Sequence, residues 1–291
     1  MNLALRDQFD AMERQRVRDA LFDLAETVLR TEVQPSDSVD RVDVLERLLG
    51  ADVCRRLGIY RVPADFVLSV VMPVYNEART VEKTVAAVRH CGLPVELIIV
   101  DDGSNDGTRD ILKRYKQQAD VRVILHEKNQ GKGSALRTGF KHVQGDVVVV
   151  QDADCEYDPR DFMVLLQPIL EDQADVVYGS RYSGGDRRVS PLWHQSANWV
   201  LTGLSNLCTQ LKLSDVETCY KMMRRDVLDK IAPTLEERRF GIEIEITAKL
   251  AKLKGIRFHE RPISYAHRNW LEGKKIGFRD ALRAVWCMVR Y

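Results

Sequence analysis

From Phe66 onward, short apolar runs alternate with stretches that carry apolar residues at helical spacing. The runs are rich in Val and Ile and are bounded by Gly, Pro, Asn and Asp, which is typical of strands. This alternation predicts an α/β fold, with a mostly parallel sheet and helices on both of its faces. The expected strands are 67–72, 95–100, 121–125, 147–150 and 174–178, and the expected helices are 80–90, 108–118, 133–143 and 161–170.

Residues 1–65 follow a different pattern. Apolar residues recur at helical spacing over 3–29, among many charged residues, and again over 44–49. The pattern predicts a helical N-terminal extension of two or three helices, followed by the α/β domain at 66–291. The extension carries no recognisable chemistry, so packing or homo-oligomer formation is its expected role.

Composition narrows the class of protein. The 291 residues include 44 Lys and Arg against 43 Asp and Glu, a formal net charge of +1, which does not favour a nucleic-acid binder. The six cysteines lack Cys-x-x-Cys spacing, so we expect reduced thiols and no zinc site. The charged N-terminus does not resemble a signal peptide, and no apolar stretch reaches the roughly 20 residues that span a bilayer. We therefore expect a cytoplasmic protein that could still act at the face of a membrane.

Carboxylates follow the most apolar of the expected strands. Asp152, Asp154 and Glu156 come directly after the run 147–150. Ligands gather at the carboxyl ends of parallel strands, and carboxylate oxygens suit Mg²⁺ or Mn²⁺ bound to a substrate diphosphate. The segment therefore indicates a nucleotide-dependent transferase. A polar turn closing a strand is the alternative that so short a match leaves open.

Two other strand ends and one helix entry carry polar motifs. Residues 72–77 offer the flat ring of Tyr75 and the carboxylate of Glu77, which could accept from a nucleotide base. Residues 101–108 place two adjacent Asp residues before a Gly-containing turn, and 129–133 combine Gly with Lys132, which suits approach to a phosphate. Taken singly, the last two segments could equally be a turn and a helix-entry loop, and neither has P-loop or dinucleotide-binding spacing.

Five motifs stand in a fixed order: Pro-Val-Tyr-Asn-Glu, Val-Asp-Asp-Gly-Ser-Asn-Asp-Gly-Thr, Asn-Gln-Gly-Lys-Gly, Gln-Asp-Ala-Asp and Gly-Ser-Arg. In this order they resemble the family 2 inverting glycosyltransferases, and within them the polyprenyl-phosphate (dolichyl-phosphate) mannose or glucose synthases. The resemblance covers about residues 66–291. It implies a GT-A fold, a nucleotide-sugar donor of the GDP-mannose or UDP-glucose type, a polyprenyl-phosphate acceptor and Mg²⁺ or Mn²⁺.

The resemblance also assigns roles to individual positions. The residues that would hold the nucleotide base are Pro73, Tyr75, Glu77, Val100 and Asp102. Those that would surround the metal and the diphosphate are Asp152, Ala153, Asp154 and Glu156, where many relatives carry Gln in place of Glu156. The cations that would contact the phosphates are Arg181, Arg268 and Lys274.

The acceptor half departs from the resemblance. Residues 215–221 resemble the segment Asp-x-x-Ser/Thr-Gly-Phe-Lys/Arg of the synthases, with Cys219 in place of Gly. The synthases often carry an acceptor-phosphate Arg shortly after Gly-Ser/Thr-Arg, where this chain has His194 or Gln195. A lipid-phosphate acceptor therefore has less support than the nucleotide-sugar donor.

The expected reaction is a single in-line displacement at the anomeric carbon of the sugar. A phosphate acceptor is already ionised at neutral pH and needs no general base, whereas a hydroxyl acceptor needs one. Asp215 and Glu243 are the candidates for such a base.

Other classes remain open. A family 2 enzyme with a hydroxyl acceptor fits the same motifs, and a catalytically silent scaffold could act through the N-terminal extension. A nucleotidylyltransferase fits less well, because its first strand is usually followed by a Gly-rich basic loop. Two amphipathic stretches, 192–213 and 278–291, contain Trp and could lie in a lipid interface or pack against protein.

Overall fold

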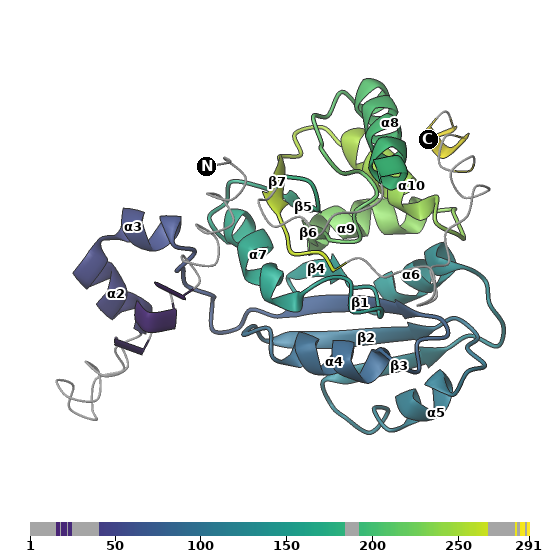
Figure 1. The fold of residues 1–291 in the computed structure, drawn as a ribbon, viewed down its shortest axis with the longest axis horizontal. Coiled ribbons are helices and arrows are strands. Elements are labelled where there is room, and N and C mark those ends of the chain that lie inside the picture. The colour runs from purple at the N-terminus through teal and green to yellow at the C-terminus, as the bar shows by residue number, and fades with distance from the viewer. Residues whose placement is uncertain are drawn as a thin grey trace. The chain divides into compact units, whose positions relative to one another are not determined.

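The computed structural model describes residues 41–183 and 192–266 and parts of 16–24 and 283–291. The chain divides between Asp65 and Phe66 into a small N-terminal unit and a larger C-terminal unit. The C-terminal unit contains the sheet (Figure 1).

In the described part of the N-terminal unit, helices α2 (Arg41–Leu49) and α3 (Ala51–Arg56) follow one another, and the described residues within 16–24 are also helical. Leu45 and Cys54 are buried at their contact, with Ile59 closing the small apolar cluster. The helical pattern predicted over 44–49 is confirmed by α2. Most of the pattern at 3–29 lies outside the described residues.

A seven-stranded sheet, in the order β3-β2-β1-β4-β6-β5-β7, forms the centre of the C-terminal unit. Strand β6 runs antiparallel to both of its neighbours, and every other pairing is parallel. The strands are β1 (Leu68–Val74), β2 (Val95–Asp101), β3 (Val121–Leu125), β4 (Val147–Val150), β5 (Val176–Ser180), β6 (Lys221–Arg224) and β7 (Phe258–Pro262).

Helices cover both faces of this sheet, since β4 and β5 are buried at every position and therefore meet protein on each side. The predicted α/β fold class is confirmed. The helices are α4 (Val81–Arg89), α5 (Thr108–Lys113), α6 (Lys132–Phe140), α7 (Phe162–Leu170), α8 (Leu192–Thr209), α9 (Arg225–Ile231) and α10 (Ile242–Ala251), with short 3₁₀ turns at Pro159–Asp161 and Ala232–Thr234.

Several predicted boundaries were wrong by a few residues. The strands expected at 67–72 and 95–100 continue to Val74 and Asp101, so the motifs begin inside the sheet. The helix expected at 108–118 ends at Lys113, and the one expected at 133–143 spans Lys132–Phe140. Strands β6 and β7 were not predicted, because each is short and contains charged residues.

The strand order places the motifs at one edge of the sheet. The chain runs outward from β1 through β2 to β3, then returns to place β4 on the other side of β1. This reversal is a topological switch point, where ligands bind at the carboxyl ends of strands in open α/β sheets. Because β6 is antiparallel, the residues that precede it also reach this edge.

Close packing of α6 against β1 permits one stability test. A Cβ atom at Gly139 would overlap Cγ1 of Val71, so Gly139→Ala should lower the free energy of unfolding by about 1–3 kcal/mol. At Gly203 in α8 an added Cβ meets nothing within 4 Å, and Gly203→Ala should stabilise by about 0.5–1 kcal/mol. Urea denaturation measures both variants, and equal effects would contradict the packing described for α6.

Candidate functional site

The loops that follow β1 and β2 are joined by hydrogen bonds. Asn76, with a positive φ of 53°, accepts at Oδ1 from the amide of Asn105 (2.9 Å) and donates its own amide to Ser104 Oγ (2.9 Å). The amide of Glu77 donates to Thr108 Oγ1 (2.9 Å). Tyr75 and Glu77 therefore lie half-buried in a braced loop at the switch point, beside the end of β2. The nucleotide roles of these residues and of Pro73 stay predictions.

Asp102 is buried and organises a third loop. Its Oδ1 accepts from the amide of Gln130 (3.0 Å) and its Oδ2 from the amide of Gly131 (2.7 Å). His126 Nδ1 lies 2.8 Å from Oδ1. Asp102 thus ties the Gly-rich loop to the end of β2, and its predicted contact with the nucleotide remains a prediction. Val100 is buried within β2, so any nucleotide contact there would involve its backbone.

Lys132 joins two carboxylates at the centre of the site. Its Nζ lies 2.8 Å from Asp152 Oδ1 and 2.9 Å from Glu243 Oε1. Burial favours the neutral amine, but the charges of Asp152 and Glu243 outweigh burial and raise the pKa of Lys132 well above its ordinary value. The sequence pointed to Lys132 only as a possible phosphate contact, and the Gly-Lys-Gly spacing was the signal available.

Asp154 and Glu156 belong to the same loop but have different hydrogen-bond partners. Asp154 Oδ1 accepts from the amide of Glu156 (3.1 Å). Glu156 Oε2 accepts from Tyr265 OH (2.7 Å), and the carbonyl of Glu156 accepts from the amide of Ala266 (2.8 Å). Cys155 between them has a φ of 60°, a left-handed backbone conformation that is uncommon for a residue other than Gly.

These carboxylates fit a metal that is shared with a substrate. Within residues 41–183 and 192–266, no three His, Cys, Asp or Glu side chains converge closely enough to form a metal site by themselves. Mg²⁺ at diphosphate sites commonly uses one or two carboxylates and takes its other ligands from phosphate and water. Asp152 and Asp154 supply such hard oxygen donors. Direct ligation by Glu156, which is bonded to Tyr265, stays a prediction.

Arg181, directly after β5, forms a paired contact with Asp215. Its Nε and Nη2 each lie 2.7 Å from one oxygen of that carboxylate. The guanidinium also lies 5.2 Å from the ring centroid of Tyr265. Burial acts against the charged form, but Asp215 more than compensates and raises the pKa of Arg181 well above its ordinary value. The guanidinium is therefore charged and held in one orientation at the sheet edge.

The two carboxylates proposed as general bases are both ion-paired. Asp215 is buried against Arg181, and Glu243 lies between Lys132 and the buried Lys221, whose Nζ is 2.7 Å from Glu243 Oε2. Burial would raise the pKa of Glu243, but the two ammonium groups outweigh it and lower that pKa. A carboxylate stabilised in this way is a weak base. Proton abstraction by Glu243 is therefore not favoured, and both oxygens of Asp215 are engaged by Arg181.

Glu217 is an ionisable group of the site that the sequence did not identify. Burial raises the pKa of its carboxyl from 4.5 to about 7, and the charge of Glu243 adds to this while Lys221 opposes it. The sequence of the Asp215–Lys221 segment does not predict that the Glu217 side chain is buried, because this burial depends on how β6 enters the sheet.

Several predicted residues cannot be placed. Arg268 and Lys274 lie outside the described residues, as do the side chains of His194 and Gln195.

Ala153 is buried, and its carbonyl accepts from Thr84 Oγ1 (3.2 Å). The described site thus pairs Lys132 with Asp152 and Glu243, and Arg181 with Asp215, at the carboxyl ends of β4 and β5.

Comparison with known proteins gives one family. The sequence model described as glycosyl transferase family 2 matches residues 69–232. An undecaprenyl-phosphate 4-deoxy-4-formamido-L-arabinose transferase from Salmonella paratyphi A is 29% identical over 213 residues, which cover 71% of this chain and 62% of that protein. A protein of the same name from Salmonella dublin matches equally. The aligned region therefore spans 62% of the length of these relatives.

Solved structures share the fold. Glucosyl-3-phosphoglycerate synthase from Mycobacterium tuberculosis, solved with Mn²⁺, UDP and phosphoglyceric acid, superposes with a TM-score of 0.61. It is 19% identical, and the match covers 89% of this chain and 84% of that one. A second structure of that synthase, with Mg²⁺ and UDP, gives a TM-score of 0.59 at 20% identity and covers 78% and 79%. The predicted GT-A fold is confirmed.

The environment of Glu217 predicts a pH effect on stability. Its pKa is about 7 in the folded chain against 4.5 ordinarily, so the folded chain binds more protons in this range and loses stability as pH rises through it. Glu217→Gln removes that loss. At pH about 8 the variant should be more stable than the parent by on the order of 1 kcal/mol, and near pH 4 the gain should vanish.

Urea denaturation across this pH range measures the effect. Glu82→Gln is the matched control, because Glu82 is exposed and paired with Arg114, and it should not change the pH slope. Parallel pH profiles for the parent and Glu217→Gln would show that Glu217 titrates normally.

Proposed function

The chain belongs to glycosyl transferase family 2, and we propose that it is an inverting glycosyltransferase that moves a hexose from a nucleoside-diphosphate sugar to a polyprenyl phosphate. Family membership confirms the resemblance seen in the five ordered motifs. The observation that carries the proposal is the group at the ends of β4 and β5, where Asp152 pairs with Lys132, Asp154 follows in the same loop, and Arg181 is held by Asp215.

The donor half rests on charge. A nucleoside diphosphate brings negative charge that must be neutralised as the sugar leaves it. Mg²⁺ or Mn²⁺ held by Asp152 and Asp154 would supply Lewis-acid stabilisation of that diphosphate. Arg181 would add a planar donor suited to phosphate oxygens. The M. tuberculosis synthase, solved with UDP and Mn²⁺ or Mg²⁺, favours uridine over guanosine as our first expectation for the base.

The proposal for the acceptor rests on the ion pairing of the two carboxylates that were predicted as general bases. Asp215 and Glu243 are both ion-paired, which favours an acceptor that arrives already ionised. A polyprenyl phosphate meets this requirement, and the Salmonella relatives are named for transfer to undecaprenyl phosphate. A hydroxyl acceptor would need a base, and the ion pairs of Asp215 and Glu243 disfavour these two candidates.

In the proposed reaction, a phosphate oxygen of the acceptor attacks the anomeric carbon of the donor sugar. The bond from that carbon to the β-phosphate oxygen breaks, and its electron pair leaves with the nucleoside diphosphate. Arg181 orients phosphate oxygens, and Lys132 holds Asp152 in place. Tyr265, hydrogen-bonded to Glu156, covers one side of the guanidinium.

Asp154→Ala should lower the rate of transfer by about 10²-fold or more, because it removes a donor for the metal and diphosphate. Chelation of divalent metal should abolish transfer by the parent, and Mg²⁺ or Mn²⁺ should restore it. Release of nucleoside diphosphate measures the rate, with circular dichroism to confirm the fold. Asp226→Ala, an exposed carboxylate paired with Lys230, is the matched control. Full activity of Asp154→Ala would rule out its assigned role.

A thermal-shift panel of UDP- and GDP-sugars with Mn²⁺ identifies the donor. A ligand at about 100 times its Kd adds about 2.7 kcal/mol of apparent stability, so Tm should rise by several degrees with the uridine series. A response to GDP-sugars alone would show that the donor base is guanine and not uracil, and the proposed type of reaction would stand. A panel without any response would contradict the proposed donor class.

A further inference from the structure

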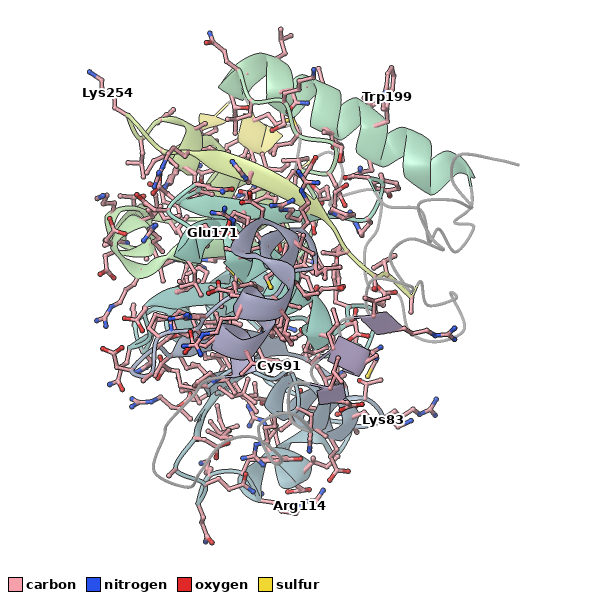
Figure 2. All side chains as sticks on the ribbon, turned by 90° about the vertical axis from the view of Figure 1, so that its left-hand side faces the viewer. Lys83, Cys91, Arg114, Glu171, Trp199 and Lys254 are labelled. Atoms are coloured by element: carbon pink, nitrogen blue, oxygen red, sulfur yellow. The ribbon has the colours of Figure 1, made fainter. Side chains whose placement is uncertain are left out.

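Helix α8 exposes a line of large apolar side chains, called here the apolar stripe: Trp199, Val200, Leu204 and Leu207. Their relative exposures are 78%, 51%, 40% and 78%. Spacings of one, five and eight residues place them on one side of an α-helix. Figure 2 shows the side chain of Trp199 standing off α8, away from the sheet.

The opposite side of α8 is buried and mostly polar, although Leu201 on that side packs against an apolar cluster that includes Val216 and Ile244. Asn198, Thr202 and Ser205 are all buried, and Thr202 Oγ1 accepts from the amide of Val216 (3.2 Å). A surface helix in water normally shows the reverse arrangement, with apolar residues inward and polar residues outward. So large an exposed apolar stripe, opposite a mostly polar inner side, indicates that the outer face of α8 meets something other than water.

We propose that the apolar stripe docks on a lipid surface that carries anionic headgroups. The proposal rests on the proposed function, in which the acceptor is a lipid phosphate. The sequence from 187 to 213 contains three basic residues and no acidic residue, which complements an anionic membrane. Trp is the residue most typical of the membrane–water interface, and α8 contains no Lys, Arg, Asp or Glu that would resist burial in it.

Partial insertion, and not a crossing, is the mode that fits. No helix among the described residues has the length and apolar character needed to traverse a bilayer. Shallow insertion requires only the apolar stripe, with its polar backing kept inside the protein.

The apolar stripe is connected to the active site through short hydrogen-bonded links. The side chain of Asn206 makes two hydrogen bonds to the backbone of Leu213. Asn206 Nδ2 donates to the carbonyl of Leu213 (2.8 Å), and the amide of Leu213 donates to Asn206 Oδ1 (3.0 Å). Two residues later Asp215 holds Arg181, and Val216 is bonded to Thr202. Docking would therefore set the distance between the bilayer surface and the guanidinium that would orient phosphate.

Vesicle flotation tests the proposal without any substrate. The full chain should float with vesicles of phosphatidylcholine and phosphatidylglycerol and bind less to phosphatidylcholine alone. The double variant Trp199→Gln/Leu207→Gln should weaken binding by about tenfold or more, because two large apolar side chains no longer leave water. Both positions are exposed, so the fold should be unchanged.

The matched control is Leu48→Gln/Val164→Gln, which removes two exposed apolar side chains outside α8 and should bind vesicles like the parent. Equal binding by the parent and the α8 variant would overturn the proposal. A second result would also overturn it: the parent is a dimer in sedimentation velocity and does not bind vesicles, and the α8 variant is a monomer. The apolar stripe would then contact a second copy of the chain.

The two proposals fail in different ways. Transfer to polyprenyl phosphate in detergent, with no vesicle binding through α8, would leave the proposed function standing and remove the docking surface. Vesicle binding that depends on α8, with no transfer to any polyprenyl phosphate, would keep the docking surface and remove the proposed acceptor.

Discussion

Charge balance at the carboxyl ends of the central strands is the constraint on which the site depends. Several carboxylates converge there in a partly dry environment, where unpaired charges are costly. Lys132 and Lys221 flank Glu243, and Arg181 pairs with Asp215. Lys132 and Arg181 are thus positioned by their carboxylate partners, and in the proposed function they would already be in place when the diphosphate arrives.

The parts of the site that could be predicted are those encoded locally. A β-branched run followed by Asp152 and Asp154 specifies both a buried strand and its polar end, so fold class and motif positions follow from short patterns. The contact between Arg181 and Asp215 joins residues 34 positions apart and leaves no local trace. Lys221 shows the same limit, because a buried lysine cannot be distinguished in sequence from an exposed one.

The sequence pattern of α8 alone could not show which side of the helix faces the protein. Amphipathic spacing over 192–213 shows that one side of the helix is apolar, but not which side meets the protein. Only the buried contacts of Thr202 and Asn206 identify the polar side as the inner one.

The antiparallel strand β6 has a consequence for the order in which the molecule assembles. Its register with β4 pairs Val147 with Arg224, a contact that closes a long loop. Long-range pairings of this kind form slowly, because closing the loop lowers the conformational entropy of the chain before the new contacts stabilise it. During synthesis, β1 to β4 leave the ribosome well before β6 is made. The carboxylates after β4 thus exist first without Lys221 and Asp215, and the chain gains its completed site only when its later part has folded back into the sheet.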